Sequence, residues 1–369
     1  MKKVFAWIKR QFNVGYLVAL LISLTVALLI GAVILAVTGY DVGYALGSLV
    51  GGSFTSPVFF GNMLEYAMVL CLCGLACDVG SRAGIFNVGG EGQLLLGALF
   101  AAQIGAWLKD VSPWIAVPCA ALGAIAVGGF YAFVPGILKV KLKVNEVITT
   151  IMLNSVAVYI CNYFAKGPWK SPNPRVFSDT EKLSKSFLFG QIIPGSSLST
   201  AIIASAVLTF LTWYILQKTT KGYEMRLTGD NPRFARFAGI KADRIVIIAM
   251  VVSGMMCGLC GMFRVYGVTG YYTSAISDEY YFEGLMVAMI AQYQPIPTII
   301  ISLIFAILRW GAVYMENTVP IQIYWIIQTA VIFCMAGEKG IRAAIHKARE
   351  KRAARRDVEK RREGGAVHE

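Results

Sequence analysis

Long apolar runs, separated by short polar segments, occupy most of this chain. The pattern predicts membrane-crossing helices at approximately 17–38, 62–80, 93–108, 114–136, 147–164, 198–216, 245–263, 281–293, 297–313 and 319–336. A helix of about 20 apolar residues crosses the hydrocarbon core of a bilayer. The stretch 16–37 exceeds the roughly 7–15 residues of a signal-peptide core, so we expect it to be retained. The pattern therefore predicts an all-α polytopic membrane protein with about ten transmembrane helices.

One polar, glycine-rich segment breaks this pattern. Residues 83–93, with the sequence AGIFNVGGEGQ, carry Asn87, Glu91 and Gln93 between two apolar runs. Non-helical backbone at membrane depth occurs only where protein or a water-filled cavity satisfies its polar groups. Broken helices of this kind line substrate paths in transporters, and a half-helix starting near Glu91 would direct its positive end into the protein. The break, residues 83–93, therefore predicts a pathway.

Three further polar groups lie in or beside apolar runs. In the first group, Asn145 and Glu146 lead into Thr149, Thr150 and Asn154, which share a face at helical spacing. The second group is Glu283 with Gln292, Tyr293 and Gln294. The third is Glu65, which lies in the second apolar run. Such groups are costly in a membrane unless they are paired or face water, which makes them candidates for a pathway. The alternative is structural: Glu91 and Glu146 pair with Arg82 or a lysine, and the amides bond to neighbouring helices. The candidate pathway residues are Asn87, Glu91, Gln93, Asn145, Glu146, Asn154 and Glu283.

Composition and charge support a membrane protein of defined orientation. Hydrophobic residues make up 57% of the 369 residues, above the roughly 45–50% of soluble domains. The net charge is +13, and most of the 34 Lys and Arg residues fall on one side if the N-terminus is cytoplasmic. This bias is the positive-inside rule, so both termini are expected in the cytoplasm. The charge therefore reflects topology, and nucleic-acid binding is the weaker interpretation.

Polar segments divide the chain around one membrane domain. We expect a cytoplasmic N-terminus at 1–16, a transmembrane domain at 17–337, and a basic cytoplasmic tail at 338–369. The tail is interpreted as a solvated extension, and attraction to anionic lipid is a further contribution that its charge allows. Within the domain, the exterior loop 165–196 is either a solvated connector or a docking site for an extracellular partner. The loop 217–244 is cytoplasmic.

The cytoplasmic loop contains a predicted amphipathic helix within 222–240. Asn231 is a typical cap, Pro232 suits the first helical position, and Gly239 suits the end. Phe234 and Ala235 share one face with Ala238. This helix either lies on the bilayer surface or docks a cytoplasmic protein.

Catalytic chemistry has little support in the sequence. The two histidines, His346 and His368, both lie in the polar tail, and neither a phosphate-binding loop nor a zinc-type spacing occurs. All eight cysteines lie in apolar runs, and we interpret Cys257 and Cys260, within GMMCGLCG, as helix packing rather than chemistry. The chain is not expected to be an enzyme, and any ATP hydrolysis must come from another subunit.

Four motifs resemble one family of transporters. The segment GIFNVGGEGQ at 84–93 resembles the G-x-x-N-[IV]-G-x-E-G-Q signature of ABC-importer permeases for branched-chain amino acids and simple sugars. The segment 144–154 resembles the corresponding run of the nucleoside and simple-sugar subgroup. The segment 225–240 resembles the cytoplasmic coupling loop of the family, and the segment 282–291 is similar to a motif usually written F-D-G-I-A-V-A-L-L-G. The resemblance covers about 60–337, with three departures: Glu283 replaces Asp, Gln292 to Gln294 replace a basic or Asn-rich run, and Arg264 enters an apolar stretch.

The resemblance implies the function and the partners. It implies a permease subunit in the bacterial plasma membrane that moves a nucleoside, in particular a purine nucleoside, into the cell. The implied partners are a second homologous permease forming a heterodimer, ATP-binding cassette ATPases and an extracellular substrate-binding lipoprotein, with membrane lipids around them and no nucleic acid. ATP and Mg belong to the ATPases, and no cofactor is expected in this chain. The implied ATPase-coupling residues are Glu224, Arg226, Gly229, Asn231, Ala235 and Gly239.

Other functions stay open at this point. Within the family, the alternative is a pentose or hexose importer. From other classes, the alternatives are an ion-coupled secondary transporter, with Glu91, Glu146 or Glu283 as its proton site, and a membrane scaffold that uses the basic tail.

Overall fold

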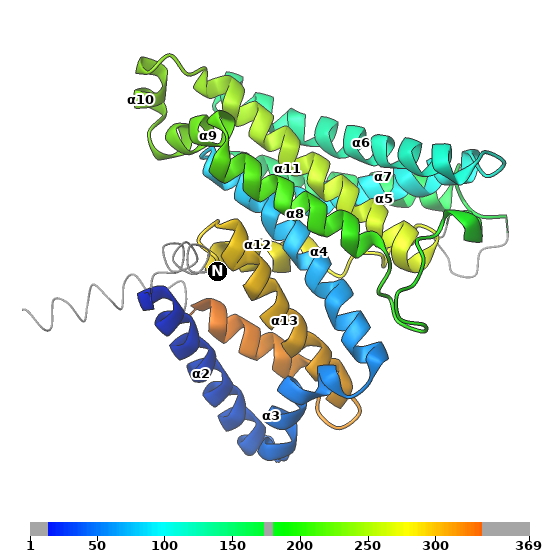
Figure 1. Ribbon diagram of the computed structural model, residues 1–369, viewed down its shortest axis with the longest axis vertical. Coiled ribbons are helices and arrows are strands. Elements are labelled where there is room, and N and C mark those ends of the chain that lie inside the picture. The colour runs from blue at the N-terminus through cyan, green and yellow to red at the C-terminus, as the bar shows by residue number, and fades with distance from the viewer. Residues whose placement is uncertain (1–13, 173–179, 334–369) are drawn as a thin grey trace, which may run out of the picture. The chain divides into compact units, whose positions relative to one another are not determined.

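The computed structural model describes residues 14–172 and 180–333, and in these ranges the secondary structure is helical apart from two isolated bridges (Figure 1). The helices are α2 (Val14–Val37), α3 (Val42–Gly51), η1 (Gly52–Phe54), α4 (Pro57–Arg82), α5 (Gly90–Trp107), α6 (Pro113–Leu142), α7 (Glu146–Lys166), η2 (Lys185–Phe187), α8 (Ala201–Lys218), α9 (Thr220–Asp230), α10 (Pro232–Phe237), α11 (Ala242–Arg264), the π-helical η3 (Val265–Thr269), α12 (Tyr280–Ile290) and α13 (Pro295–Met315). A last apolar helix covers Gln322–Phe333. The predicted all-α class is confirmed.

Six helices among the described residues are long and apolar enough to cross a membrane. They are Pro57–Arg82, Pro113–Leu142, Glu146–Lys166, Ala201–Lys218, Ala242–Thr269 and Pro295–Tyr314. Shorter apolar helices cover Ile22–Val37, Val42–Phe54, Tyr280–Ile290 and Gln322–Phe333. The helix at Val42–Phe54 was not expected, because its short run includes several glycines and lacks the length of a span. The number of crossings and the side of the termini stay predictions.

The chain forms two compact units. Among the described residues, one comprises 14–46 and 318–333, and the other comprises 47–172 and 180–317. In the first unit, α2 packs on the last helix, since a Cβ placed on Gly31 would lie 2.7 Å from the side chain of Ile327. The basic tail from 338 lies outside the described residues.

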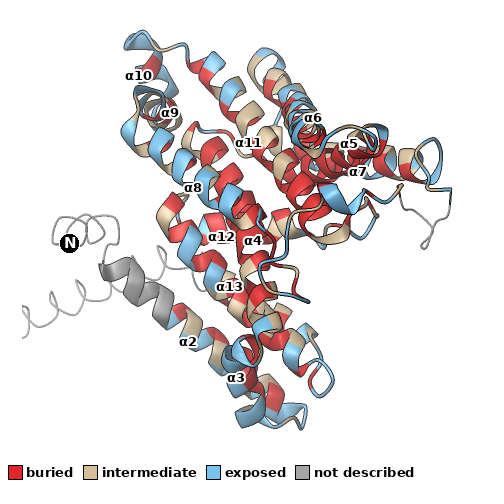
Figure 2. Ribbon diagram, turned by 45° about the vertical axis from the view of Figure 1, so that its right-hand side comes forward, coloured by how far each residue is buried: buried red, intermediate tan, exposed pale blue. Residues whose placement is uncertain are grey.

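The larger unit is built around α4, α5 and α11. α11 packs against α4, α5 and α6, while α12 and α13 pack against α4. Buried residues concentrate on α4, on α5 and on the second half of α11 (Figure 2). The close approach of α6 and α11 at Gly128 and Gly258 agrees with the interpretation of the GMMCGLCG segment as packing, since a Cβ on Gly128 would lie 3.1 Å from the Cα of Gly258.

The loop after α7 is folded onto the end of α11. Backbone hydrogen bonds join Leu183 to Gly270 at 2.8 Å and Phe189 to Tyr266 at 2.9 Å, and Leu183 and Phe187 are buried. The described part of this loop is therefore more than a solvated connector. It forms a cover over the segment that follows α11.

The predicted amphipathic helix within 222–240 is two helices. α9 ends at Asp230 and α10 begins at Pro232, with Asn231 between them in an extended conformation. The predicted cap at Asn231, start at Pro232 and end at Gly239 are those of α10, whereas α9 was not predicted as a separate helix. The two are separate because Asn231 caps α10 and Pro232 has no N–H to continue α9. The three residues expected on one face differ in burial: Ala235 is buried, whereas Phe234 and Ala238 are exposed.

Candidate functional site

The break between α4 and α5 is held by a buried amide cluster. The side-chain amide of Asn87 donates to Gln93 Oε1 and to Ser253 Oγ, both at 2.9 Å, and its oxygen accepts from Gly89 N at 2.9 Å. Asn87 and Gln93 are almost fully buried. Buried polar groups need such partners, so this cluster satisfies the polar side chains of the interrupted segment.

Asn154 fastens the same segment to α7. Its side-chain oxygen accepts from Gly92 N, and its amide donates to Val88 O, each at 2.9 Å. The sequence pattern placed Asn154 on one helical face with Thr149 and Thr150, and the structure buries this side chain against the break. The side chain supports the backbone of the break directly.

Asn145 and Glu146 lie elsewhere on α7. Asn145 is exposed and caps the helix by accepting from Val147 N at 2.9 Å, and Glu146 pairs with Lys139 at 2.6 Å. Eight or nine residues at 1.5 Å each separate them from Asn154 by about 12–14 Å along the axis. The structure therefore does not bring these two residues into the buried amide cluster.

The helices α5 and α12 begin beside each other in the buried interior. Glu91 lies in the first turn of α5, and one of its carboxylate oxygens accepts from the backbone N–H of Tyr281 at 3.1 Å, in the first turn of α12. The hydroxyl of Tyr281 donates to Asn87 O at 2.5 Å. A carboxylate at helix N-termini is favourable because their unpaired N–H groups carry partial positive charge. Glu91 therefore connects the starts of α5 and α12.

Glu283 lies two residues further along α12. It is buried and accepts a hydrogen bond from the hydroxyl of Tyr66 in α4. Gln292, Tyr293 and Gln294 follow the other end of α12, whose last residue is Ile290. Glu283 and this polar turn thus lie at opposite ends of α12.

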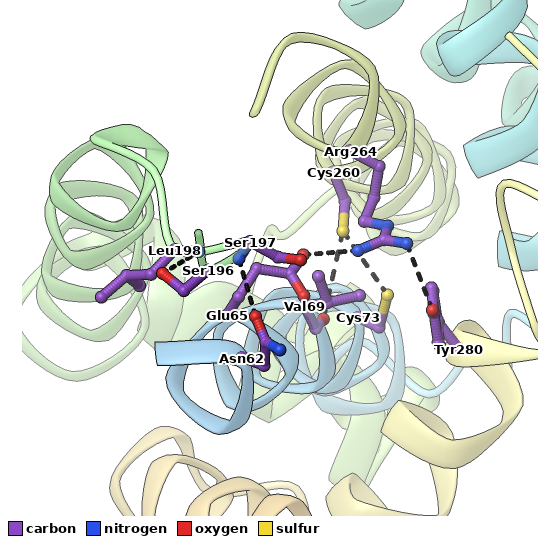
Figure 3. A network of polar contacts seen from close by, with 10 residues as sticks. All are labelled: Asn62, Glu65, Val69, Cys73, Ser196, Ser197, Leu198, Cys260, Arg264 and Tyr280. Carbon is purple, nitrogen blue, oxygen red and sulfur yellow. Dashed lines mark hydrogen bonds and ion pairs between the residues drawn. The ribbon is translucent and has the colours of Figure 1, made fainter. Parts of the chain in front are cut away.

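Glu65 forms a buried ion pair with Arg264 of α11. The Oε1 and Nη1 atoms are 2.7 Å apart, and the side chains are only 5% and 11% exposed. Arg264 also donates to the hydroxyl of Tyr280 at 3.2 Å, so three elements converge on its guanidinium (Figure 3). Nearby, the sulfur atoms of Cys73 and Cys260 lie 3.8 Å apart. The positive charge of Arg264, which lies in an otherwise apolar stretch of the sequence, is thus neutralised by Glu65.

Sequence reasoning missed three residues of this region. Asp78 is fully buried in α4 and accepts from Thr298 Oγ1 at 2.9 Å. A carboxylate within an apolar run, the signal that selected Glu65, would have found it. Ser253 and Tyr281 carry no comparable signal, because a serine or a tyrosine in an apolar helix is common.

The helix pair α9 and α10 touches the break through two glycines. Gly84 has a φ of 75°, which glycine adopts readily. A Cβ on Gly84 would lie 3.1 Å from Gly229 Cα, and one on Gly229 would lie 2.5 Å from Arg82 O. The end of α9 therefore packs directly on the backbone that leaves α4.

The remaining predicted coupling residues shape the helix pair. Glu224 pairs with Lys221 at 2.8 Å, and Arg226 donates to Leu216 O at 2.6 Å. Asn231 accepts from Phe234 N at 3.0 Å as the cap of α10, and Gly239, at a φ of 81°, follows its end. The predicted cap, start and end of α10 are consistent with the structure.

A polar cavity of about 300 Å³ adjoins the glycine contact. Arg82, Arg226 and Asp230 line it together with the turn after α12. Arg82 donates from Nε to Tyr293 O at 2.8 Å. The residues described here contain no group of three or more His, Cys, Asp or Glu side chains suited to a metal ion.

Comparisons with known proteins agree with the motifs. Residues 59–336 match the family described as branched-chain amino acid transport system / permease component. The chain is 31% identical to the guanosine ABC transporter permease protein NupP of Bacillus subtilis (strain 168), over 83% of this chain and 89% of that protein. It is 28% identical to the nucleoside ABC transporter permease protein NupB of Lactococcus lactis subsp. cremoris (strain MG1363), over 80% and 83%.

A third relative carries a different substrate in its name. The chain is 31% identical to the glucose ABC transporter permease protein TsgB13 of Haloferax volcanii, over 76% of each chain. No solved structure matches the chain. The family match spans most of the sequence and includes the four motifs. The chain therefore belongs to the family of branched-chain amino acid transport system permease components, and it is a multi-pass plasma-membrane transport subunit of the ABC type.

Proposed function

We propose that this permease moves nucleosides, purine nucleosides in particular, into the cell. Support for this substrate comes from NupP and NupB, whose names specify guanosine and nucleosides. TsgB13, named for glucose, is as similar in identity but matches a smaller share of this chain. Sugar import is therefore the alternative function, and an uptake experiment distinguishes it from nucleoside import.

The path is proposed to pass the place where α5 and α12 begin. The observation that carries this proposal is the Glu91–Tyr281 hydrogen bond, because it joins the starts of two helices beside a non-helical segment. Such interrupted helices form substrate sites in transporters. Asn87, Gln93, Asn154 and Glu283 surround this place, while Asn145 and Glu146 would lie at the cytoplasmic mouth.

The proposed topology has about ten crossings, with both termini in the cytoplasm. It places the basic segments, including 217–244, on the side that the positive-inside rule requires. The domain limits are 17–337 for the membrane domain and 338–369 for the basic tail. The loop 165–196 is then exterior, where its folded part could receive a substrate-binding lipoprotein.

ATP hydrolysis is proposed to reach the path through α9 and α10. In this proposal an ATPase of the ATP-binding cassette type binds the helix pair, holds ATP and Mg itself, and displaces Gly229 against Gly84. The chain itself needs no cofactor. A second homologous permease completes the pore, as suggested by two guanosine permease proteins from one organism, NupP and NupQ, which are both similar to this chain.

Uptake by the assembled transporter tests this function. The chain is expressed with the ATPase, second permease and lipoprotein encoded beside it, in cells that lack nucleoside uptake, and labelled guanosine is measured with unlabelled glucose or ribose as competitors. We expect guanosine uptake that excess sugar leaves unchanged and vanadate abolishes. If only sugar is taken up, the substrate is a sugar and not a nucleoside. If a protonophore stops uptake and vanadate does not, the chain is an ion-coupled carrier instead.

A further inference from the structure

A cavity of about 790 Å³ opens between α8, α9 and α11, apart from the proposed path. α8 and α11 both pack against α4, whose Val79 also lines this cavity, and Met225 of α9 contributes another side. The volume is typical of a site for one small molecule. We refer to this space as the lateral cavity.

The walls of the lateral cavity are apolar and face outward from the helix bundle. Ile215 of α8 and Ile248 of α11, on opposite walls, are 39% and 44% exposed. Both helices are long and apolar enough to cross a membrane, so these side chains are exposed to hydrocarbon rather than to water. A polar nucleoside does not match such walls.

One end of the lateral cavity is basic. Lys241 and Arg244, at the start of α11, line it, are exposed and have no acidic partner among the described residues. Lys221 also lines it, but Glu224 neutralises that charge at 2.8 Å. The neighbouring Asp243 pairs with Arg236 at 2.7 Å instead. Two uncompensated positive charges therefore remain at this end.

Along α11, the lining of the lateral cavity extends over about the depth of one bilayer leaflet. Along α11, the lining runs from Lys241 through Ile245 and Ile248 to Val252. Eleven residues at 1.5 Å each span about 16 Å, and one leaflet contributes roughly 15 Å of hydrocarbon. The lining thus has a charged end at the headgroup level and an apolar end near the midplane.

We propose that the lateral cavity binds one anionic phospholipid, with its phosphate against Lys241 and Arg244 and an acyl chain between α8 and α11. Basic pockets between transmembrane helices on the cytoplasmic side are suited to acidic headgroups. A soluble partner does not fit the apolar end, because the residues that line it on α8 and α11, from Thr212 to Leu216 and from Ile245 to Val252, belong to helices able to cross a membrane. The site joins α9 to α11, so the bound lipid contacts the helix that touches the break.

Native mass spectrometry of the full-length chain tests the site with dioleoyl phosphatidylglycerol and, as the neutral reference, dioleoyl phosphatidylcholine. We expect one tightly retained phosphatidylglycerol and no equivalent phosphatidylcholine. The double variant Lys241→Gln/Arg244→Gln is expected to weaken phosphatidylglycerol binding roughly 25-fold, about fivefold for each basic group near the membrane surface. Arg233→Gln is the matched control, since Arg233 is exposed on α10 and does not line the cavity.

A second variant separates the cavity from surface charge. Ile248→Trp fills the apolar wall without changing charge, and its partly exposed position tolerates a larger side chain. It is expected to displace the retained lipid. Unchanged lipid binding in Ile248→Trp, or an equal loss in Arg233→Gln, would overturn the proposal.

Photocrosslinking in the assembled transporter tests the alternative occupants. A photoreactive residue at position 248 is expected to label phospholipid. Labelling of the ATPase or of the second permease instead would show that a protein covers this face and would also overturn the proposal. These readouts measure lipid directly, so they stand independently of which substrate the transporter moves.

Discussion

Gly229 of α9 and Gly84 of the break lie against each other without side chains between them. A Cβ on Gly229 would lie 2.5 Å from the carbonyl oxygen of Arg82 and 3.0 Å from the amide nitrogen of Gly84. The atoms it would meet belong to the backbone, so they cannot move aside as a side chain would. This contact connects the proposed ATPase-binding helices to the segment beside the path.

Replacing Gly229 with alanine is expected to uncouple ATP hydrolysis from transport. The added methyl group forces α9 away from the break, and overpacking of this kind typically costs about 1–3 kcal/mol. Substrate-stimulated ATPase activity in proteoliposomes should fall, while the amount of chain in the membrane stays constant. Gly47→Ala in α3 is the control, because a Cβ there meets nothing within 4 Å. Full stimulation in Gly229→Ala would refute the coupling role of the contact.

Asn154→Ala is expected to destabilise the break. It removes the partners of Gly92 N and Val88 O, and each buried polar group left unpaired costs about 1–3 kcal/mol. Asn145→Ala removes only an exposed helix cap, which typically costs about 1 kcal/mol. Thermal inactivation of the purified transporter should therefore shift more for Asn154→Ala. Equal shifts would contradict the role of Asn154 as a support of the break.

Substitutions of Glu91 distinguish a structural role, in which it joins the starts of α5 and α12, from a role as a proton site. In Glu91→Gln the amide oxygen can still accept from Tyr281 N, whereas Glu91→Ala leaves that N–H without its acceptor. We expect substantial uptake in Glu91→Gln and loss in Glu91→Ala. A proton-coupled carrier using Glu91 predicts loss in both, because an amide does not ionise. Uptake of labelled nucleoside at saturating ATP separates the two.

The ion pair between Glu65 and Arg264 is expected to be costly to break from one side. Glu65→Gln leaves a buried guanidinium without its counter-charge, and removing one partner of a buried pair typically costs about 3–5 kcal/mol. Loss of folded chain, measured by size-exclusion chromatography after heating, should occur at lower temperature.

Two matched variants complete this test. Glu181→Gln removes a partner of the exposed pair with Lys109, for which about 0–1 kcal/mol is expected. The double variant Glu65→Leu/Arg264→Met removes both charges and should recover stability relative to Glu65→Gln. If Glu65→Gln is as stable as Glu181→Gln, the buried pair carries no structural role.

Much of the helical pattern was readable from the sequence, because each long apolar run must bury its backbone polar groups in a helix to cross a membrane. The break was readable for the same reason, since glycines, Asn87 and Glu91 interrupt an apolar pattern. Asn231, Pro232 and Gly239 predicted the cap, start and end of α10 through local backbone preferences. Family membership followed from motifs in a fixed order, which require no structure.

Only the tertiary structure decided which polar residues meet. Sequence spacing placed Asn145, Glu146 and Asn154 on one helix, yet only Asn154 reaches the break, because the other two lie more than two turns away. Tyr281, Ser253 and Arg264 come from distant parts of the chain, and no local pattern specifies that they contact Asn87 or Glu65. Local preferences set helices and their ends, whereas the pairing of buried charges and amides depends on which helices pack together.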